Sequence, residues 1–221
     1  MIRCCIFDLD GTLLNTLDAL TLTVNLTLEH FGYEPVDEAH VREFVGDGYK
    51  LLMERVLKYR GDETLEHYEE SLDVYMELFA EHCMHNVRPY DGIRELLEEL
   101  KKHNIKIAVL SNKPHARTVE NIERVFGKGY FDYVAGEKTG IPRKPDPAGV
   151  IRILDELQIH PEECLYFGDT NTDMKTGLGA GLSTVGVTWG FRDREELESF
   201  HPQYIISHPS EVFDRILKKN P

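Results

Sequence analysis

The chain has 221 residues, of which 41% are hydrophobic and 29% are charged, which is the balance of an ordinary globular protein. Its formal net charge of −14 argues against nucleic acid as a partner, because phosphate backbones bind basic surfaces. No apolar run approaches the roughly 20 residues that a membrane-spanning helix needs. The N-terminus also lacks the pattern of a signal peptide. We therefore expect a cytoplasmic protein with neither nucleic-acid nor membrane partners.

Six short runs that are rich in β-branched and apolar residues predict β-strands. These runs are 2–7, 105–110, 133–135, 164–167, 183–187 and 204–206. Between the later runs, two segments have the apolar spacing of an amphipathic helix. Their apolar residues are Ile93, Leu96, Leu97 and Leu100 in the first, and Val150, Ile151, Leu154 and Leu157 in the second. Strands that alternate with single helices indicate parallel βαβ units, so we predict an α/β fold with a doubly wound parallel sheet.

The stretch between the first two strands breaks this alternation. Apolar residues recur there at intervals of three and four, namely Leu17, Leu20, Val24, Leu28 and Phe31. Two more helical stretches follow, one after "FVGDGYK" and one near 66–82. A βαβ crossover needs only about a dozen residues, so this segment is far too long for one. We predict a helical domain over 15–86 that is inserted into an α/β core made of 1–14 and 87–221.

The four cysteines give no sign of a metal or redox motif. Cys4, Cys5, Cys83 and Cys164 include no CxxC pair, and Cys4, Cys5 and Cys164 lie within predicted strands. Cysteine is among the most often buried residues. We expect four small core residues in a reducing compartment.

Polar residues follow three of the predicted strands at their carboxyl ends. They are Asp8, Asp10 and Thr12 after the first strand, Ser111, Asn112 and Lys113 after the second, and Gly168, Asp169, Thr170 and Asp173 after the fourth. Lys144 precedes the helix before the fourth strand, on a segment that Pro145 keeps out of the helical conformation. Ligands of open parallel sheets bind at the carboxyl ends of strands, so we expect these side chains to converge.

This set of residues has a chemical logic. Converging carboxylates repel one another, and a divalent cation relieves that repulsion. Ligands that are all oxygen favour Mg²⁺ over zinc. Ser111, Lys144 and the backbone N–H groups of the Gly11–Thr12 turn offer hydrogen-bond donors and positive charge to a tetrahedral anion. A carboxylate nucleophile, a metal and an anion site together indicate phosphoryl transfer through an aspartyl-phosphate.

Four segments resemble, in order, the four motifs of the haloacid dehalogenase-like phosphatase superfamily. They are "FDLDGTL", a strand followed by "SN", "RKPDP" and "GDTNTD", and the resemblance spans essentially the whole chain. It implies that Asp8 is the nucleophile and that Asp10 is the general acid and then the general base. Because the dehalogenase branch lacks an acid at the position of Asp10, phosphate ester hydrolysis is favoured.

The same resemblance assigns the remaining residues at the strand ends. Mg²⁺ would be held by Asp8, the main-chain carbonyl of Asp10, and Asp169, with Asp173 supporting the metal or its waters. The phosphoryl group would be bound by Gly11, Thr12, Ser111, Asn112 and Lys144. Lys144 would also neutralise the charge of Asp8.

The inserted helices resemble the helical cap of this family. Together with "RPYDGI", "SNKP" and "VGVTWGF", the stretch 41–57 resembles the phosphoglycolate phosphatases, which makes 2-phosphoglycolate the expected substrate. The Gly46–Gly48 turn would then face the nucleophile, and Arg42 or Lys50 would meet the substrate carboxylate. The alternative is a plain turn between helices, with Arg42 and Lys50 solvated.

Other functions stay open at this point. Related proteins prefer pyrophosphate, nucleotides or sugar phosphates, and a phosphosugar mutase would use the same scaffold. From a different class, a signalling receiver domain combines an acceptor aspartate, acidic metal ligands, a hydroxyl residue and a lysine. Receivers are much shorter and have no large insertion after the acidic strand end. We expect a monomer or homodimer that acts on a small phosphorylated metabolite.

Overall fold

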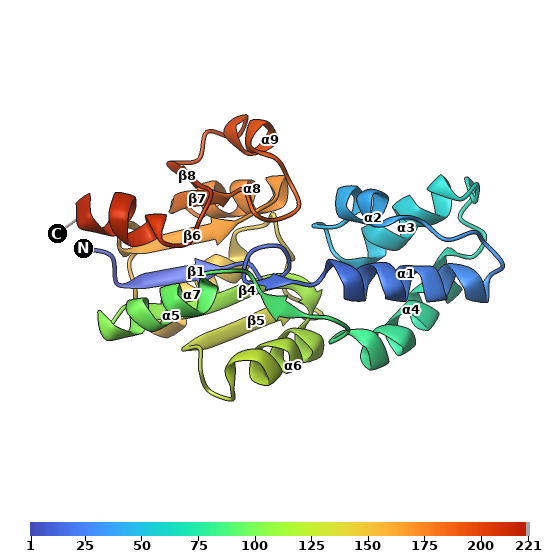
Figure 1. Ribbon diagram of the computed structural model, residues 1–221, viewed down its shortest axis with the longest axis horizontal. Helices are drawn as coiled ribbons and strands as arrows, with labels where there is room; N and C mark the ends of the chain where they lie inside the picture. The colour runs from blue at the N-terminus through green and yellow to red at the C-terminus, as the bar shows by residue number, and fades with distance from the viewer. Residues whose placement is uncertain (220–221) are drawn as a thin grey trace. The chain divides into compact units, whose positions relative to one another are not determined.

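The computed structural model describes residues 1–219, and these fold into two compact units (Figure 1). Met1–Leu14 and the chain from Pro89 onward form an α/β unit, and Asn15–Arg88 form a helical unit. Two short strands, β2 (Leu14–Asn15) and β3 (Arg88–Pro89), pair where the chain leaves and re-enters the α/β unit. Within the described residues, no helix combines the length and the apolar character that crossing a membrane requires.

The α/β unit is built on a six-stranded sheet in which every neighbouring pair is parallel. Its strands, in spatial order, are β5 (Tyr133–Glu137), β4 (Lys106–Pro114), β1 (Cys4–Phe7), β6 (Cys164–Gly168), β7 (Ser183–Val187) and β8 (Tyr204–Ile206). The predicted α/β fold with a parallel sheet is confirmed. Because β1 lies between β4 and β6, the carboxyl ends of these three strands are neighbours.

Helices follow the strands and cover the sheet, as Figure 1 shows. They are α5 (Ile93–Lys102), α6 (His115–Phe126), α7 (Ala148–Leu157), α8 (Asn171–Gly179) and α9 (Arg194–Glu198). Shorter helical turns occur at Pro161–Glu163, Val212–Ile216 and Leu217–Lys219. The four apolar residues predicted for the face of α5 are all buried.

The buried face predicted for α7 is wrong at one of its four residues. Ile151 was expected to be buried, but its side chain is 49% exposed, and Ile153 is buried instead. Counting three, four and seven residues onward from Val150 gives Ile153, Leu154 and Leu157, and these four share the buried face. They pack against alternate side chains of β1, β4 and β6, which form one hydrophobic cluster: Cys4, Ile6, Ala108, Leu110, Cys164 and Tyr166.

The helical unit contains one helix that the sequence did not predict. Its helices are α1 (Leu17–His30), α2 (Glu38–Phe44), α3 (Tyr49–Tyr59) and α4 (Tyr68–His82). The unpredicted helix, α2, has seven residues and buries only Val41, so it leaves no periodic apolar pattern. Its start is nevertheless capped, because the Asp37 carboxylate accepts a hydrogen bond from the His40 N–H at 2.9 Å.

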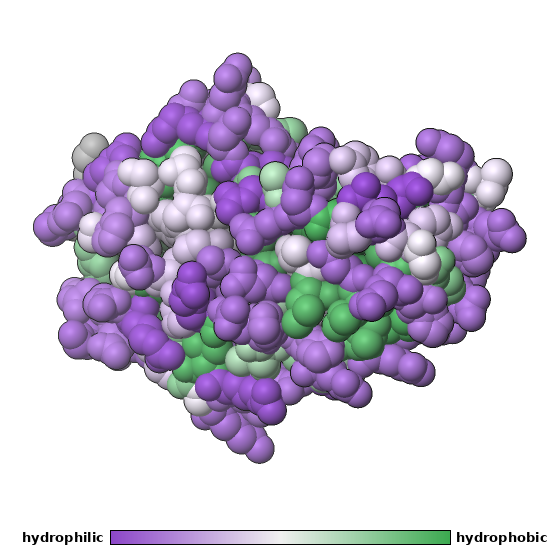
Figure 2. Space-filling model, turned by 45° about the vertical axis from the view of Figure 1, so that its right-hand side comes forward, coloured by the Kyte–Doolittle hydropathy of each residue, from purple (hydrophilic) through white to green (hydrophobic). Residues whose placement is uncertain are grey.

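Hydrophilic residues cover most of the face seen in Figure 2, with smaller hydrophobic patches between them. Among the described residues, the large exposed hydrophobic side chains are those of Met1, Tyr59, Ile151 and Leu178. All four cysteines are buried and free, as expected for small core residues.

We expect two glycines of α8 to respond oppositely to alanine. A Cβ at Gly177 would lie 2.4 Å from Thr184 Oγ1, whereas a Cβ at Gly179 would meet nothing within 4 Å. Gly177→Ala therefore overpacks a buried contact and lowers the free energy of unfolding by about 1–3 kcal/mol. Gly179→Ala raises helix propensity and changes it by less than about 1 kcal/mol, in the stabilising direction. Urea unfolding of both variants tests this, and equal midpoints would contradict it.

Candidate active site

The turn after β1 carries the first group of predicted residues. Asp8 N–H donates to the carbonyl of Phe167 at 2.9 Å, which extends the pairing of β1 with β6 as far as Asp8. The chain then turns at Gly11, whose φ is +89°. A Cβ at Gly11 would lie 2.2 Å from an oxygen of Asp169, so this position has no room for a side chain. The turn thus brings Asp8 and Asp169 close together.

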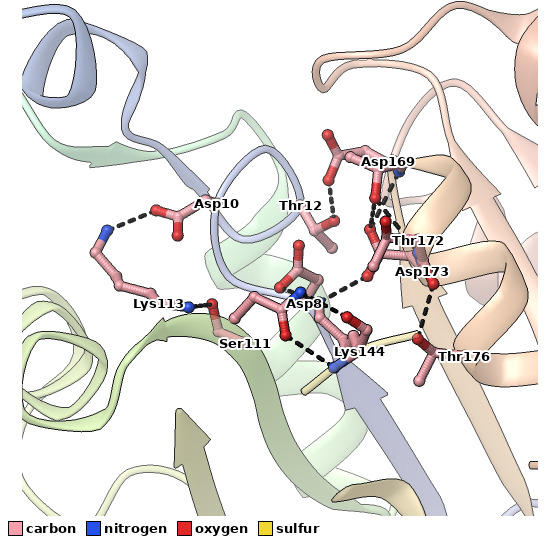
Figure 3. Close-up of polar contacts among 12 residues, drawn as sticks. Asp8, Asp10, Thr12, Ser111, Lys113, Lys144, Asp169, Thr172, Asp173 and Thr176 are labelled. Atoms are coloured by element: carbon pink, nitrogen blue, oxygen red, sulfur yellow. Dashed lines mark hydrogen bonds and ion pairs between the residues drawn. The ribbon is translucent and has the colours of Figure 1, made fainter. Parts of the chain in front are cut away.

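Lys144 lies between two carboxylates, as Figure 3 shows. Its buried Nζ is 2.7 Å from Asp8 Oδ1 and 2.7 Å from Asp173 Oδ1. Its backbone is held by Asn112, whose side-chain oxygen accepts from the Lys144 N–H at 2.9 Å. The Asn112 side-chain nitrogen donates to the Lys144 carbonyl at 3.0 Å. The amide of Asn112, predicted to bind phosphate, therefore supports Lys144.

Asp173 receives donors on both carboxylate oxygens. Oδ1 accepts from Lys144 Nζ at 2.7 Å and from the Tyr166 hydroxyl at 3.2 Å. Oδ2 accepts from the Thr170 hydroxyl at 2.6 Å and from the Thr170 N–H at 3.1 Å. The Thr170 hydroxyl in turn accepts from the Asp173 N–H, which completes a capping box at the start of α8. The helix start thus fixes the carboxylate that faces Lys144.

Asp169 is buried but has fewer partners. Its Oδ1 accepts from the Thr12 hydroxyl at 2.7 Å, and its Oδ2 accepts from the Phe191 N–H at 2.8 Å. The indole N–H of Trp189 donates to the Thr12 carbonyl at 3.0 Å, so the loop after β7 also holds the turn after β1. Nothing in the sequence pattern indicated this contact of Trp189.

Asp10 is paired with Lys113, which the sequence placed after the second predicted strand without giving it a role. Lys113 Nζ lies 2.6 Å from Asp10 Oδ1, and the two side chains are 3% and 15% exposed. The predicted strand ended at 110, whereas β4 continues to Pro114. In the longer strand, Ser111 and Lys113 lie on the same side by simple alternation, which is the signal that could have given Lys113 a place in the site.

Comparison with known proteins places this geometry in a family. The family model of the haloacid dehalogenase-like hydrolases matches residues 5–187, which include Lys144 and the carboxyl ends of β1, β4 and β6. The chain belongs to the haloacid dehalogenase-like hydrolases. The resemblance inferred from the four motifs is confirmed.

Several relatives of this hydrolase match it over nearly their whole length. A phosphoglycolate phosphatase of Aquifex aeolicus is 33% identical over 95% of this chain and 94% of its own. A phosphoglycolate phosphatase of Mesorhizobium japonicum is 34% identical, covering 92% and 89%. The crystal structure of a Lactobacillus delbrueckii subsp. bulgaricus protein, provisionally named phosphoglycolate phosphatase, has a TM-score of 0.90 at 28% identity and covers 97% of this chain and 98% of that one.

The electrostatics of the hydrolase site are dominated by burial. Asp8, Asp169 and Asp173 offer carboxylate oxygens that lie within 4.8 Å of one another. Burial raises the pKa of Asp8, the charge of Asp173 raises it further, and Lys144 opposes the rise. Burial, with the help of Asp173, also raises the pKa of Asp169 to about 7. When all three carboxyl groups are ionised, the cluster carries more negative charge than the ammonium group of Lys144 offsets.

The pKa of Lys144 also reflects the excess of carboxyl groups over ammonium groups in the cluster. Burial alone would lower it, but the carboxylates of Asp173 and Asp8 outweigh burial and hold it well above its usual range. A divalent cation would relieve the remaining charge, and the all-oxygen donor set suits Mg²⁺. Asp173 already accepts four hydrogen bonds, which fills its acceptor sites. Asp8 and Asp169 are therefore the side chains that fit as ligands.

The cap residues predicted to bind substrate lie in the helical unit. Arg42 ends up on α2, 3.9 Å from Glu38, and Lys50 lies in the first turn of α3. Gly46 and Gly48 form the turn between these helices. Arg55, which the sequence did not single out, fastens this turn by donating to the Phe44 carbonyl and the Asp47 carboxylate, both at 2.6 Å. Contact of these residues with substrate stays a prediction.

We expect Asp169 to make the metal-free hydrolase less stable as pH rises. The unfolded Asp169 ionises near pH 4, but in the folded state its pKa is about 7. Between these values the folded state binds one more proton than the unfolded state. Each pH unit of increase therefore lowers the free energy of unfolding by up to ~1.4 kcal/mol.

Urea unfolding in EDTA between pH 4 and pH 7 tests this pH dependence. Asp169→Asn should have a shallower slope than the wild type by about one proton. Asp155→Asn, on the exposed side of α7, should keep the wild-type slope. Parallel curves for the wild type and Asp169→Asn would contradict the prediction.

Proposed function

We propose that this hydrolase is a Mg²⁺-dependent phosphatase that cleaves a small phosphate monoester through an aspartyl-phosphate on Asp8, with 2-phosphoglycolate as its substrate. The observation that carries the proposal is the buried Lys144 Nζ, 2.7 Å from both Asp8 and Asp173, beside the buried carboxyl group of Asp169. A divalent cation would offset the charge of the ionised carboxylates. The ammonium group of Lys144 could then face the negative charge of a phosphoryl group. The names of the relatives at 33% and 34% identity support the substrate.

In the first half of the reaction, an Asp8 carboxylate oxygen attacks phosphorus. The bond between phosphorus and the ester oxygen breaks, and the departing oxygen takes a proton from Asp10. Lys144 favours this step because its ammonium meets the phosphoryl oxygens while it stays paired with Asp173. The products of this half are the free alcohol and the acyl phosphate on Asp8.

In the second half, water hydrolyses the acyl phosphate. Asp10, now ionised, takes a proton from the water, whose oxygen attacks phosphorus. The bond between phosphorus and Asp8 breaks, which releases inorganic phosphate and restores both carboxyl groups. Hydrolysis of a phosphate ester needs one proton transfer to the leaving oxygen and one from the attacking water. A carboxyl group at Asp10 can carry out both, which favours a phosphatase over a dehalogenase.

The remaining groups bind the anion. The Ser111 hydroxyl accepts from the Lys113 N–H at 3.2 Å, and it can donate its own hydrogen to a phosphoryl oxygen. The Gly11 N–H already donates to the Leu14 carbonyl at 2.9 Å, so other backbone N–H groups after Asp8 would supply the further donors at the turn. Mg²⁺, held by Asp8, Asp169 and the main-chain carbonyl of Asp10, would offset the charge of the phosphoryl oxygens.

We expect metal-dependent phosphate release that requires Asp8. With Mg²⁺, the wild type should release phosphate from 2-phosphoglycolate with a higher kcat/KM than from pyrophosphate, a nucleoside monophosphate or glucose 6-phosphate. EDTA should abolish release. Asp8→Asn should lower kcat by at least about 1000-fold, because it removes the nucleophile. Asp155→Asn serves as the control for an aspartate outside the site.

The same assay separates the alternatives. Equal phosphate release by the wild type and Asp8→Asn would refute the enzyme proposal. An isomerised sugar phosphate without free phosphate would indicate a mutase. A phospho-aspartate that persists for minutes after removal of the phosphate donor would indicate a receiver domain.

A further inference from the structure

Lys113 is one of two buried lysines that face carboxylates at the strand ends. In the part of the chain that the structure describes, three ion pairs have both side chains less than one-fifth exposed. Two of them belong to Lys144, and the third joins Lys113 to Asp10 at 2.6 Å. Burying a charged pair is costly, so such a pair usually fixes a geometry and contributes little net stability. The proposed reaction gives Lys113 no role, so the buried ion pair between Lys113 and Asp10 needs an explanation.

The backbone of Lys113 is anchored from three directions. Its N–H donates to Ser111 Oγ at 3.2 Å, and its carbonyl accepts from the Thr118 hydroxyl at 3.1 Å. Gly136 of β5 packs so closely that a Cβ there would lie 2.6 Å from the Lys113 carbonyl oxygen. Strand β4, strand β5 and helix α6 therefore fix the point from which the lysine side chain extends.

The Asp10 side chain is drawn away from the acidic cluster. Figure 3 shows Asp10 and Lys113 pointing toward each other, on the side opposite Asp169 and Asp173. The Asp10 carboxylate is also the more exposed member of the pair. One side of the Asp10 carboxylate is therefore open to a substrate. Its other side is held by the ammonium group of Lys113, a residue whose backbone is fixed.

We propose that Lys113 is a positioning residue, whose ammonium holds the Asp10 carboxyl where the leaving-group oxygen departs. This inference rests on the proposed phosphatase function. Without the lysine, the short Asp10 side chain is free to change rotamer and turn toward solvent or toward Lys144. The chemistry then affected is proton delivery to the leaving group, whereas attack by Asp8 on phosphorus is not.

Two substrates with different leaving groups distinguish a positioning role of Lys113 from a merely structural one, which would affect both substrates equally. A primary alkoxide, as in 2-phosphoglycolate, needs a proton to depart, whereas p-nitrophenolate is a stable anion and does not. The value of kcat/KM reports only the steps up to the first irreversible one, formation of the phosphoenzyme, so activation of water does not enter it. Lys113→Met should lower kcat/KM for 2-phosphoglycolate at least about 10-fold and for p-nitrophenyl phosphate by less than about threefold.

A matched control is available on the same strand. Lys106 lies at the other end of β4, and its Nζ donates to the Leu157 carbonyl at 3.4 Å. Lys106→Met removes the same charge and should leave both kcat/KM values near those of the wild type. Thermal unfolding of each variant checks its fold. If Lys113→Met does not fold, Lys113→Gln, which keeps a shorter hydrogen-bond donor, is taken through the same comparison with the same expected difference between substrates.

A double variant tests whether Lys113 acts through Asp10. In an Asp10→Asn background, Lys113→Met should cause no further loss of kcat/KM for 2-phosphoglycolate, because residues that act as a unit are not additive. A further loss would show that Lys113 contacts the substrate itself, and it would overturn the proposal. Equal losses with both substrates, or no loss, would also overturn it while leaving the phosphatase function intact. A wild type that turns over neither substrate would refute both proposals.

Discussion

The arrangement of the α/β unit depends on one unfavourable fact, the burial of three carboxylates beside a single ammonium group. Burial raises the pKa values of Asp8 and Asp169, so the folded protein holds these groups against their tendency to be solvated. The features around them follow from this constraint. The turn at Gly11 approaches Asp169 more closely than any side chain would allow, and Asn112 fixes the backbone of Lys144 from both sides. Such a set of oxygen donors suits a divalent cation, which would offset the charge of the ionised carboxylates.

The sequence predicted the positions of the strands well because each is a short apolar run with a clear end. For a buried parallel strand, the residue that follows the run must lie at the edge of the sheet, so Asp8, Ser111 and Asp169 could be placed without a structure. Weak periodic signals were less informative. The seven-residue helix α2 buries one side chain, and Ile151 differs from its buried neighbours only by its angle around α7.

Partners of side chains were much harder to predict than their positions. The amide of Asn112 suits a phosphate oxygen and a backbone carbonyl equally well, and only the structure shows that it binds the backbone of Lys144. Trp189 and Arg55 act through contacts with Thr12 and Asp47, residues remote in sequence or across a turn. Such contacts depend on which loops pack against one another in the folded chain. Neither the composition of one sequence nor the spacing of its residues shows which loops will meet.

The four aspartates of the site show why residue type alone does not assign a role. Asp173 has all its acceptor sites filled by protein donors, so it holds a lysine and has little left for a metal. Asp169 accepts only two hydrogen bonds, and Asp8 faces one ammonium group, so both keep lone pairs for a cation or for phosphorus. Asp10 is turned aside by its own lysine. In the proposed reaction, the division of labour among these carboxylates would follow from how many donors each one already has, and the two buried lysines would determine which carboxylate stays in the cluster and which is kept apart from it.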